Sequence, residues 1–266
     1  MYIDAHNHLQ DPRLAAEVES IVEAAASAGV VGMVVNGTTE QDWPHVQALA
    51  ERYPDLVRPA FGLHPWFIRD RSPDWGRKLQ DALAFPGSSI GEIGLDRWIK
   101  DYDIEDQRHV FLEQLALASE LKRPASIHCL RAWGELVDCL EEAERLERGF
   151  LLHSFGGSLE VAQRCIPLGA YFSFPGAFAR EKKIKQRSVF AQLPLDRILI
   201  ETDAPDQLPP RSLQSHPLQN EAGEALNHPA NLGSIYDYFA DFRAIYAKDC
   251  ANQFMSNANK LFGFAS

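Results

Sequence analysis

The regular alternation of short apolar runs with longer amphipathic stretches restricts the fold more than any other feature of the sequence. Eight apolar runs have the length of buried strands, at residues 2–5, 32–35, 57–62, 89–93, 125–128, 150–153, 170–174 and 198–202. Amphipathic segments between them predict helices over residues 14–28, 41–52, 75–84, 105–121, 132–146, 159–165 and 184–192, and the tail 235–262 predicts further helix. Strands that alternate with helices in this way indicate a parallel sheet.

The length of the chain selects one architecture among the parallel folds. The sequence has 266 residues, which matches the roughly 250 residues of an eightfold barrel. We therefore expect a (β/α)8 TIM barrel that spans residues 1–266 as a single domain. An open doubly wound sheet is the alternative, but no glycine-rich dinucleotide loop follows the first strand. The stretch 203–231 is rich in Pro, Gln and Asn and predicts a long loop at the mouth of the barrel.

Composition excludes some classes of protein. The net charge of −11 argues against non-specific coating of nucleic acid, which depends on Lys and Arg, although bound cations can supply positive charge to an enzyme acting on phosphate esters. No apolar run approaches the ~18 residues that a membrane span needs, and no leader-like segment precedes the first strand. We expect a cytoplasmic protein. The four cysteines form no CxxC pair, which favours reduced thiols.

One basic run stands out in this acidic chain. Arg180, Lys182, Lys183, Lys185 and Arg187 follow the seventh strand, with only Glu181 opposing them. A solvated helix face and a contact with a nucleic-acid backbone near the mouth of the barrel both remain open.

Polar residues stand where the predicted strands end. His6 and His8 follow the first strand two residues apart, so their side chains point to the same side. Alone this pair is a weak signal, because a His-x-His sequence is common in surface loops. Five further strand ends carry His64, Glu92, His128, His153 and Asp203. A parallel barrel gathers these ends on its catalytic face. The alternative is a group of buried, hydrogen-bonded polar residues.

These residue types favour metal chemistry. Neutral imidazoles and carboxylates suit zinc, manganese or similar divalent ions. Four histidines and two carboxylates exceed the needs of one tetrahedral site, so we expect two ions with a bridging carboxylate. Glu92 is the best bridge, and Asp203 is both a candidate ligand and a candidate general base. Paired ions lower the pKa of bound water toward about 7 and hold a substrate oxygen.

Six sequence blocks together carry a family resemblance. They begin at residues 3, 62, 91, 127, 152 and 201 and read Ile-Asp-Ala-His-Asn-His, Gly-Leu-His-Pro, Gly-Glu-Ile-Gly-Leu-Asp, Ile-His-Cys, Leu-His-Ser-Phe-Gly-Gly and Glu-Thr-Asp-Ala-Pro. With these blocks the chain resembles the TatD family of metal-dependent hydrolases, within the amidohydrolase superfamily of barrels, along nearly its whole length.

The resemblance implies a binuclear site. In this assignment, His6 and His8 bind one divalent ion with Asp203 and the bridging Glu92, and His128 and His153 bind a second ion with Glu92. The ions expected are Mg, Zn or Mn. Glu92 and Asp203 are the expected catalytic residues, and His64 lies beside the substrate phosphate.

The resemblance also implies two classes of substrate. Many members of the family are deoxyribonucleases, some of which trim strands from the 3′ end, so DNA, especially single-stranded DNA, is the expected partner. Other members remove D-amino acids from transfer RNA, which keeps hydrolysis of an ester or amide open as the alternative. A binding protein built on an inactive barrel would lack a ligand, and none is absent. A lysine-bridged lactonase would need Lys where Glu92 stands.

Three departures from the family pattern fall in loops expected to face substrate. Arg97-Trp98 stands where relatives carry aromatic pairs, and 227–232 replaces an Asn-Glu-Pro block. After the fifth strand, Arg131 is displaced by one residue from the arginine of relatives but remains a candidate for contacting a substrate phosphate. These changes leave the ligands intact and bear on substrate choice.

Four neighbours of the expected ligands have two interpretations each. Glu201 either orients a ligand or pairs locally, and Asp96 either hydrogen-bonds a ligand histidine or caps the following segment. Trp66 and Trp98 either stack a nucleobase or pack within their loops.

Overall fold

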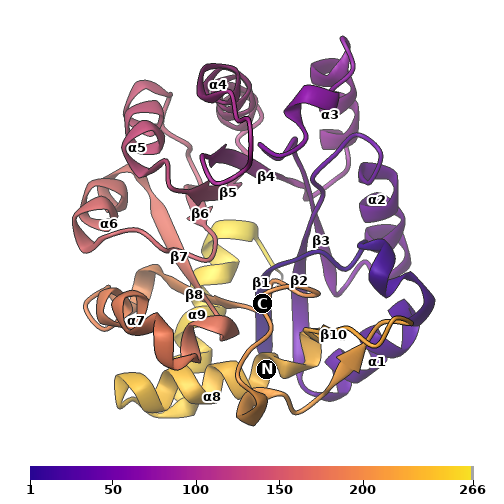
Figure 1. Cartoon of the computed structure of the whole chain (residues 1–266), viewed down its shortest axis with the longest axis vertical. Helices are drawn as coiled ribbons and strands as arrows, with labels where there is room; N and C mark the ends of the chain where they lie inside the picture. The colour runs from indigo at the N-terminus through magenta and orange to yellow at the C-terminus, as the bar shows by residue number, and fades with distance from the viewer. Residues whose placement is uncertain (265–266) are drawn as a thin grey trace.

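A parallel eight-stranded sheet surrounds the centre of the molecule, with its strands in chain order. The computed structural model describes residues 1–264. The strands are β1 (Tyr2–Asn7), β2 (Val30–Asn36), β3 (Val57–Phe61), β4 (Ser89–Asp96), β5 (Ala125–Leu130), β6 (Phe150–Leu152), β7 (Ala170–Pro175) and β8 (Ile198–Glu201). All eight predicted strands are present, and Figure 1 looks into the ring that they form.

Backbone hydrogen bonds join the first strand to the end of the last. The Asp203 N–H donates to the His6 carbonyl oxygen at 3.0 Å, and the His8 N–H donates to the Ala204 carbonyl oxygen at 2.7 Å. The Asp4 carboxylate accepts a further bond from the Thr202 N–H at 2.9 Å. The sheet therefore closes into the expected (β/α)8 barrel, and the doubly wound alternative is wrong.

Helices surround the sheet (Figure 1). They are α1 (Val18–Ser27), α2 (Trp43–Arg52), α3 (Trp75–Leu83), α4 (Ile104–Glu120), α5 (Trp133–Glu142), α6 (Leu159–Cys165), α7 (Ile184–Phe190), α8 (Leu232–Arg243) and α9 (Ala247–Phe262). Local chemistry explains where some begin: the Asp103 carboxylate caps α4 by accepting from the Glu105 and Asp106 N–H groups. Apolar side chains on the inner faces of these helices bury themselves against the sheet.

Three predicted helices differ from the structure. The segment 14–28 begins as a 3-10 helix (Pro12–Glu17), and its α-helix starts only at Val18. The segment 132–146 ends its helix at Glu142, because Ala143 is extended (φ −69°, ψ 154°) and leads the chain toward a turn at Gly149 before β6. The tail 235–262 is not continuous. Ala244 adopts a left-handed φ of 52° and separates α8 from α9, which lets the chain change direction.

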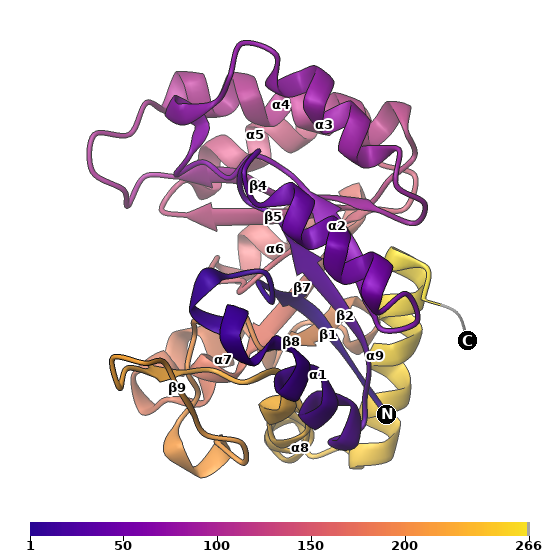
Figure 2. The ribbon, with the colours of Figure 1, turned by 90° about the vertical axis from the view of Figure 1, so that its right-hand side faces the viewer.

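The helix α9 covers one end of the barrel. Its Leu261 and Phe262 belong to an apolar cluster with side chains of β1, β2, β6 and β8, including Ile3 and Leu151. Figure 2 shows the strands pointing away from α9, toward the end that carries β9 (Leu218–Gln219). β9 pairs with β10 (Ala225–Leu226) inside the segment 203–231 that we expected to be a loop. We call the end that α9 and this apolar cluster fill the plugged end of the barrel. The polar strand ends lie at the opposite end.

Two findings bear on the expectations from composition. All four cysteines are buried and unpaired with one another. Across residues 1–264 there is no helix with both the length and the apolar character that crossing a membrane requires.

Candidate metal centre

The carboxyl ends of five strands bring imidazoles and carboxylates into one buried cluster. Glu92 lies within β4 and His128 within β5, while His153 follows β6 directly. His6 lies near the end of β1, and Asp203 follows β8. Because parallel strands all end on the same face of a barrel, residues distant in sequence meet here.

Glu92 lies at the centre of the cluster, and its two carboxylate oxygens face different groups. Its Oε2 lies 3.3 Å from His6 Nε2 and 3.2 Å from His8 Nε2. Its Oε1 lies 2.8 Å from His153 Nε2 and 3.1 Å from His128 Nδ1. One carboxylate thus joins two pairs of imidazoles.

The spacing within each pair fits a shared cation. His6 Nε2 and His8 Nε2 are 3.3 Å apart, and His128 Nδ1 and His153 Nε2 are 3.2 Å apart. Nitrogen ligands about 2.0–2.1 Å from a tetrahedral zinc ion stand roughly 3.3–3.4 Å from each other. Asp203 Oδ1 completes the first group, at 3.7 Å from His6 Nε2 and 3.5 Å from His8 Nε2. The donor set and its spacing therefore fit divalent metal ions.

Burial and charge act against each other in this cluster. Burial tends to raise the pKa of Glu92, but interaction with neighbouring imidazoles, His153 foremost, holds that pKa well below its usual range. Burial tends to lower the pKa of His8, yet hydrogen bonds to Asp203 and Glu92 raise it well above the ordinary value. Burial tends to raise the pKa of Asp203 too, but its bond to His8 and the charges of the nearby imidazoles together lower that pKa. The carboxylates are therefore ionised and attract cations.

His64 lies closer to the cluster than the sequence led us to expect. Its Nε2 is 3.3 Å from Glu92 Oε1, the oxygen that also faces His128 and His153. Burial lowers the pKa of His64 to about 4, although the Glu92 charge opposes the shift. His64 is therefore a neutral imidazole that fits a ligand role as well as a contact with substrate.

Arg131 is the one expected site residue that the structure does not bring to the cluster. Its guanidinium lies 3.7 Å from the centre of the Trp98 ring, at the exposed rim. The backbone of Arg131 has a left-handed φ of 59°, which turns the side chain onto this ring. Stacking of this kind holds Arg131 beside the mouth rather than within it.

Asp96 connects the cluster to its rim, and both interpretations of it are confirmed. Its Oδ2 lies 2.8 Å from His128 Nε2 and accepts a bond from Trp66 Nε1–H at 2.7 Å. Its Oδ1 accepts from the Trp98 N–H and thereby caps the following turn. Asp96 thus orients His128 so that its other ring nitrogen, Nδ1, faces Glu92.

Glu201 supports the opposite side of the cluster. Its Oε1 accepts bonds from the Ser154 N–H at 2.8 Å and the Ser154 hydroxyl at 2.6 Å, and lies 3.8 Å from His153 Nδ1. The Ser173 hydroxyl also donates to this carboxylate. Glu201 therefore pairs locally, as one of the two interpretations has it, and flanks His153 without hydrogen-bonding its ring.

Sequence reasoning missed Asp4. This buried carboxylate accepts bonds from Thr202 and Asn7 and so ties β1 to the segment that carries Asp203. Burial raises the pKa of Asp4 to about 7, although these hydrogen bonds lower it. The alternation of side chains along a strand, which places residues 4, 6 and 8 on one side, was the available signal.

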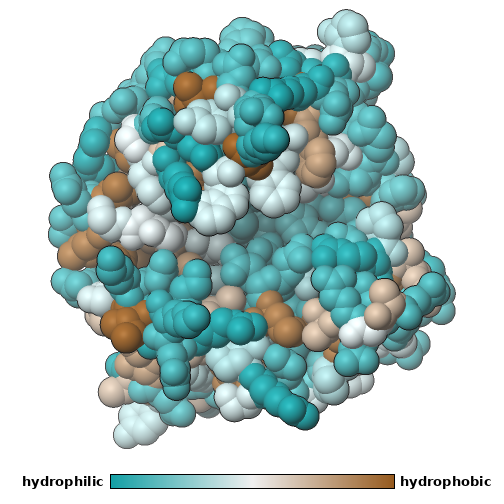
Figure 3. Space-filling view, in the orientation of Figure 1, coloured by the Kyte–Doolittle hydropathy of each residue, from teal (hydrophilic) through white to brown (hydrophobic). Residues whose placement is uncertain are grey.

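The mouth of the barrel is hydrophilic and hollowed at its centre (Figure 3). As whole residues, Trp66 and Trp98 are 51% and 59% exposed. The basic run folds back on the protein in part, because Arg187 donates to the Phe178 and Arg180 carbonyl oxygens and Arg180 donates to that of Leu208. Trp66 is thus linked to the buried cluster by its bond to Asp96. In the basic run, Arg180 and Arg187 already donate to backbone carbonyl oxygens.

Comparison with known proteins places the chain among metal-dependent hydrolases. The family model described as TatD related DNase matches residues 3–263. The metal-dependent hydrolase YjjV of Escherichia coli K12 is 33% identical over 264 residues, covering 98% of this chain and 97% of the relative. The 3′-5′ ssDNA/RNA exonuclease TatD of Pantoea vagans is 31% identical over 260 residues, covering 97% and 98%.

Solved structures agree with the sequence comparison. The crystal structure of Escherichia coli YjjV, a TatD homologue, superposes with a TM-score of 0.88 at 31% identity and covers 98% of this chain and 97% of that one. A TatD family hydrolase from Entamoeba histolytica superposes with a TM-score of 0.87 at 18% identity, covering 99% and 98%, and supports the fold.

Proposed function

The chain belongs to the TatD family of metal-dependent hydrolases, and from that premise we propose that it is a nuclease that removes nucleotides from the 3′ end of single-stranded DNA. The observation that carries the proposal is the division of the Glu92 carboxylate between two pairs of imidazoles, which suits two metal ions. Relatives of the same length named as 3′-5′ ssDNA/RNA exonucleases support phosphodiester bonds as the target.

Two divalent ions, Mg, Zn or Mn, fit the donor set. His6, His8 and Asp203 with Glu92 Oε2 would hold one ion, and His128 and His153 with Glu92 Oε1 would hold the other. When bound, such a pair supplies Lewis acidity and activates water for attack on a phosphorus atom. Asp96 keeps His128 oriented for this role, and the Glu201 carboxylate flanks His153.

The remaining steps fall to side chains of the chain itself. Asp203 is ionised and accepts the proton of the attacking water on its carboxylate. His64 is neutral, so one ring nitrogen carries a proton that it donates to a phosphate oxygen. Arg131, held at the rim by Trp98, presents positive charge to the next phosphate.

The exposed rim suits unpaired bases. Trp66 offers an open ring, and its indole N–H is already bonded to Asp96. Stacking of a base on such a ring contributes about 1–3 kcal/mol and tolerates any sequence. The bases of a single strand can reach this ring without the free-energy cost of separating a duplex. The exposed ring therefore favours single-stranded substrate.

The test is cleavage of a 5′-labelled single-stranded oligonucleotide by protein loaded in turn with Mg, Mn or Zn. We expect a ladder of products shortened from the 3′ end, and a 3′-phosphorothioate end should delay it. Asp203→Asn should abolish the ladder. Asp196→Asn is the matched control, because Asp196 is an exposed carboxylate that precedes β8 at the other end of the barrel.

A D-aminoacyl ester of transfer RNA serves as the competing substrate. One outcome would show that the chain acts on carboxylic esters. In that outcome the DNA remains uncut with each of the three metals, and the ester is hydrolysed rapidly by the unaltered protein but not by Asp203→Asn. Cleavage from the 5′ end or within the strand would keep the nuclease but overturn its polarity.

A further inference from the structure

A second hollow lies at the opposite end of the barrel from the metal centre. Gly149, Gly169 and Arg197 line it, and these residues directly precede β6, β7 and β8. Its volume is about 650 Å³, within the roughly 300–1,000 Å³ range of small-molecule sites. The metal ligands lie at the far ends of the same strands, and six residues of β7 span about 20 Å. One small ligand does not reach both places.

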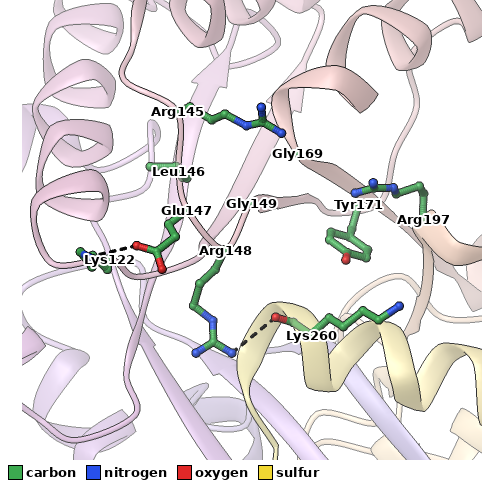
Figure 4. Close-up of a pocket in the computed structure, with 10 residues that line it drawn as sticks. All are labelled: Lys122, Arg145, Leu146, Glu147, Arg148, Gly149, Gly169, Tyr171, Arg197 and Lys260. Atoms are coloured by element: carbon green, nitrogen blue, oxygen red, sulfur yellow. Dashed lines mark hydrogen bonds and ion pairs between the residues drawn. The ribbon is translucent and has the colours of Figure 1, made fainter.

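The hollow is surrounded by cations from distant parts of the chain. Lys122, Arg145, Arg148, Arg197 and Lys260 line it, and Glu147 is the only acidic residue among the lining side chains. Figure 4 shows Arg145 and Arg197 reaching toward the space from different sides, with Lys260 on α9 along another. This concentration of positive charge occurs in a chain whose net charge is −11.

Most of these cations lack a carboxylate partner. Lys122 pairs with Glu147 at 3.2 Å. Within residues 1–264, the other four cations make no ion pair. Some guanidiniums elsewhere do have a carboxylate partner, as Arg71 has in Asp106 at 2.7 Å. Arg148 donates to the Leu261 and Lys260 carbonyl oxygens, but none of the four cations has a negative charge beside it. Cations gathered around one space repel each other, and a bound anion relieves that repulsion.

The wall of the hollow offers a hydrogen-bonding group without a partner. Tyr171 is 7% exposed and lines the hollow, and its phenol oxygen makes no hydrogen bond within the described chain. The Arg197 guanidinium lies 5.3 Å from the centre of this ring. A Cβ on Gly149 would collide with the Gly169 carbonyl, so these two positions stay free of side chains and leave the space open. The Tyr171 phenol oxygen is thus free to hydrogen-bond a ligand oxygen in the hollow.

We propose that this hollow binds a small anion with several phosphate groups, such as the phosphate chain of a nucleoside triphosphate. Guanidinium and ammonium groups suit phosphate oxygens, and a chain of phosphates matches four separate cations better than one phosphate does. The cations surround a concave space rather than forming the track that a nucleic-acid backbone follows. The proposal is independent of the reaction at the other end of the barrel.

The test is titration calorimetry with inorganic tripolyphosphate and, separately, ATP, on the full chain as purified and after EDTA treatment. The variant is Arg145→Gln/Lys260→Gln, since neither side chain makes a hydrogen bond or ion pair within residues 1–264 and the fold should survive. The control is Lys182→Gln/Lys185→Gln, which removes the same charge from the basic run. We expect saturable binding whose Kd rises at least about tenfold in the first variant and less than twofold in the control. Thermal unfolding verifies that both variants are folded.

Each outcome decides the proposal. Equal weakening in both variants, or no saturation by either probe, would show general attraction to positive charge and overturn it. Binding of a single-stranded oligonucleotide that depends on Arg145 and Lys260, with neither small probe bound, would assign the hollow to nucleic acid and also overturn it. Loss of affinity both in Tyr171→Phe and, separately, in Arg145→Gln/Lys260→Gln supports the proposal. Tighter binding of ATP than of tripolyphosphate identifies a nucleotide, and the reverse identifies an inorganic chain.

Discussion

The two ends of the barrel differ in which residues carry the left-handed backbone. Before β6 and β7, at the plugged end, Gly149 and Gly169 have positive φ. After β6 and β8, at the metal end, Ser154 and Asp203 have φ of 44° and 55°. A side chain in this region costs of order 1–3 kcal/mol, whereas glycine adopts it freely. The metal end keeps these costly side chains because Asp203 belongs to the cluster and Ser154 bonds Glu201 beside it, whereas the plugged end uses glycine before β6 and β7 and keeps one such side chain, Lys122 (φ 52°), before β5.

This contrast predicts that substitutions at the two ends affect different properties. The metal end should control activity and metal content. The plugged end, where α9 fills the barrel, should control the free energy of unfolding.

Glu92→Gln should have the largest effect. It removes the charged bridge between the two imidazole pairs, and loss of Lewis-acid stabilisation worth several kcal/mol lowers kcat at least about 10³-fold. Metal content per chain, measured by mass spectrometry of the elements, should fall with it. Full activity in Glu92→Gln would remove the basis for a bridged pair of ions.

Leu261→Ala tests the plugged end. Leu261 is fully buried beneath the barrel, so the free energy of unfolding should fall by about 2–5 kcal/mol, as measured in urea. The kcat at low temperature should not change. Leu121→Ala, at an exposed leucine, should leave stability nearly unaltered. A loss of kcat in Leu261→Ala while the protein remains folded would contradict the separation of the two ends.

Asp96→Asn should have a smaller effect on activity than Glu92→Gln. It keeps the shape of the side chain but weakens the contact that orients His128, and changes of this kind typically cost about 10–100-fold in metal affinity or activity. Metal titration measures the affinity. If Asp96→Asn keeps the metal affinity but changes the midpoint of thermal unfolding, Asp96 serves only to cap the turn at Trp98.

Trp66→Ala should have the smallest effect. Loss of a stacking surface worth about 1–3 kcal/mol raises KM for single-stranded DNA roughly 5- to 150-fold and leaves kcat nearly constant. Trp66→Phe keeps an aromatic ring but loses the bond to Asp96, so it separates the two roles. If Phe restores KM, stacking is the cause; if it does not, the bond to Asp96 is.

The strands and most residues of the buried cluster could be predicted because their signals are local. A buried strand is a short apolar run, and His6, Glu92 and Asp203 each follow or end such a run within a distinctive block. The break at Ala244 could not be predicted in this way, since alanine favours helix and only packing of α8 and α9 imposes its left-handed φ.

The unpredicted features depend on residues that meet only after folding. Arg131 was expected at a phosphate, but its left-handed backbone places it on Trp98. The cationic hollow draws on Lys122, Arg197 and Lys260, whose separation along the chain leaves no motif. In the sequence they are ordinary surface charges.

The seam between β1 and β8 has a consequence for how the barrel opens. His6 lies in the first strand, His8 just after it, and Asp203 just after the last strand, so an ion shared by them would close about three quarters of the chain into one loop. Closing a loop lowers the entropy of the unfolded chain by an amount that grows with the logarithm of loop length. Bound metal would then act as a cross-link that stabilises the closed barrel. The metal-loaded protein should therefore resist proteases that cut the opened barrel.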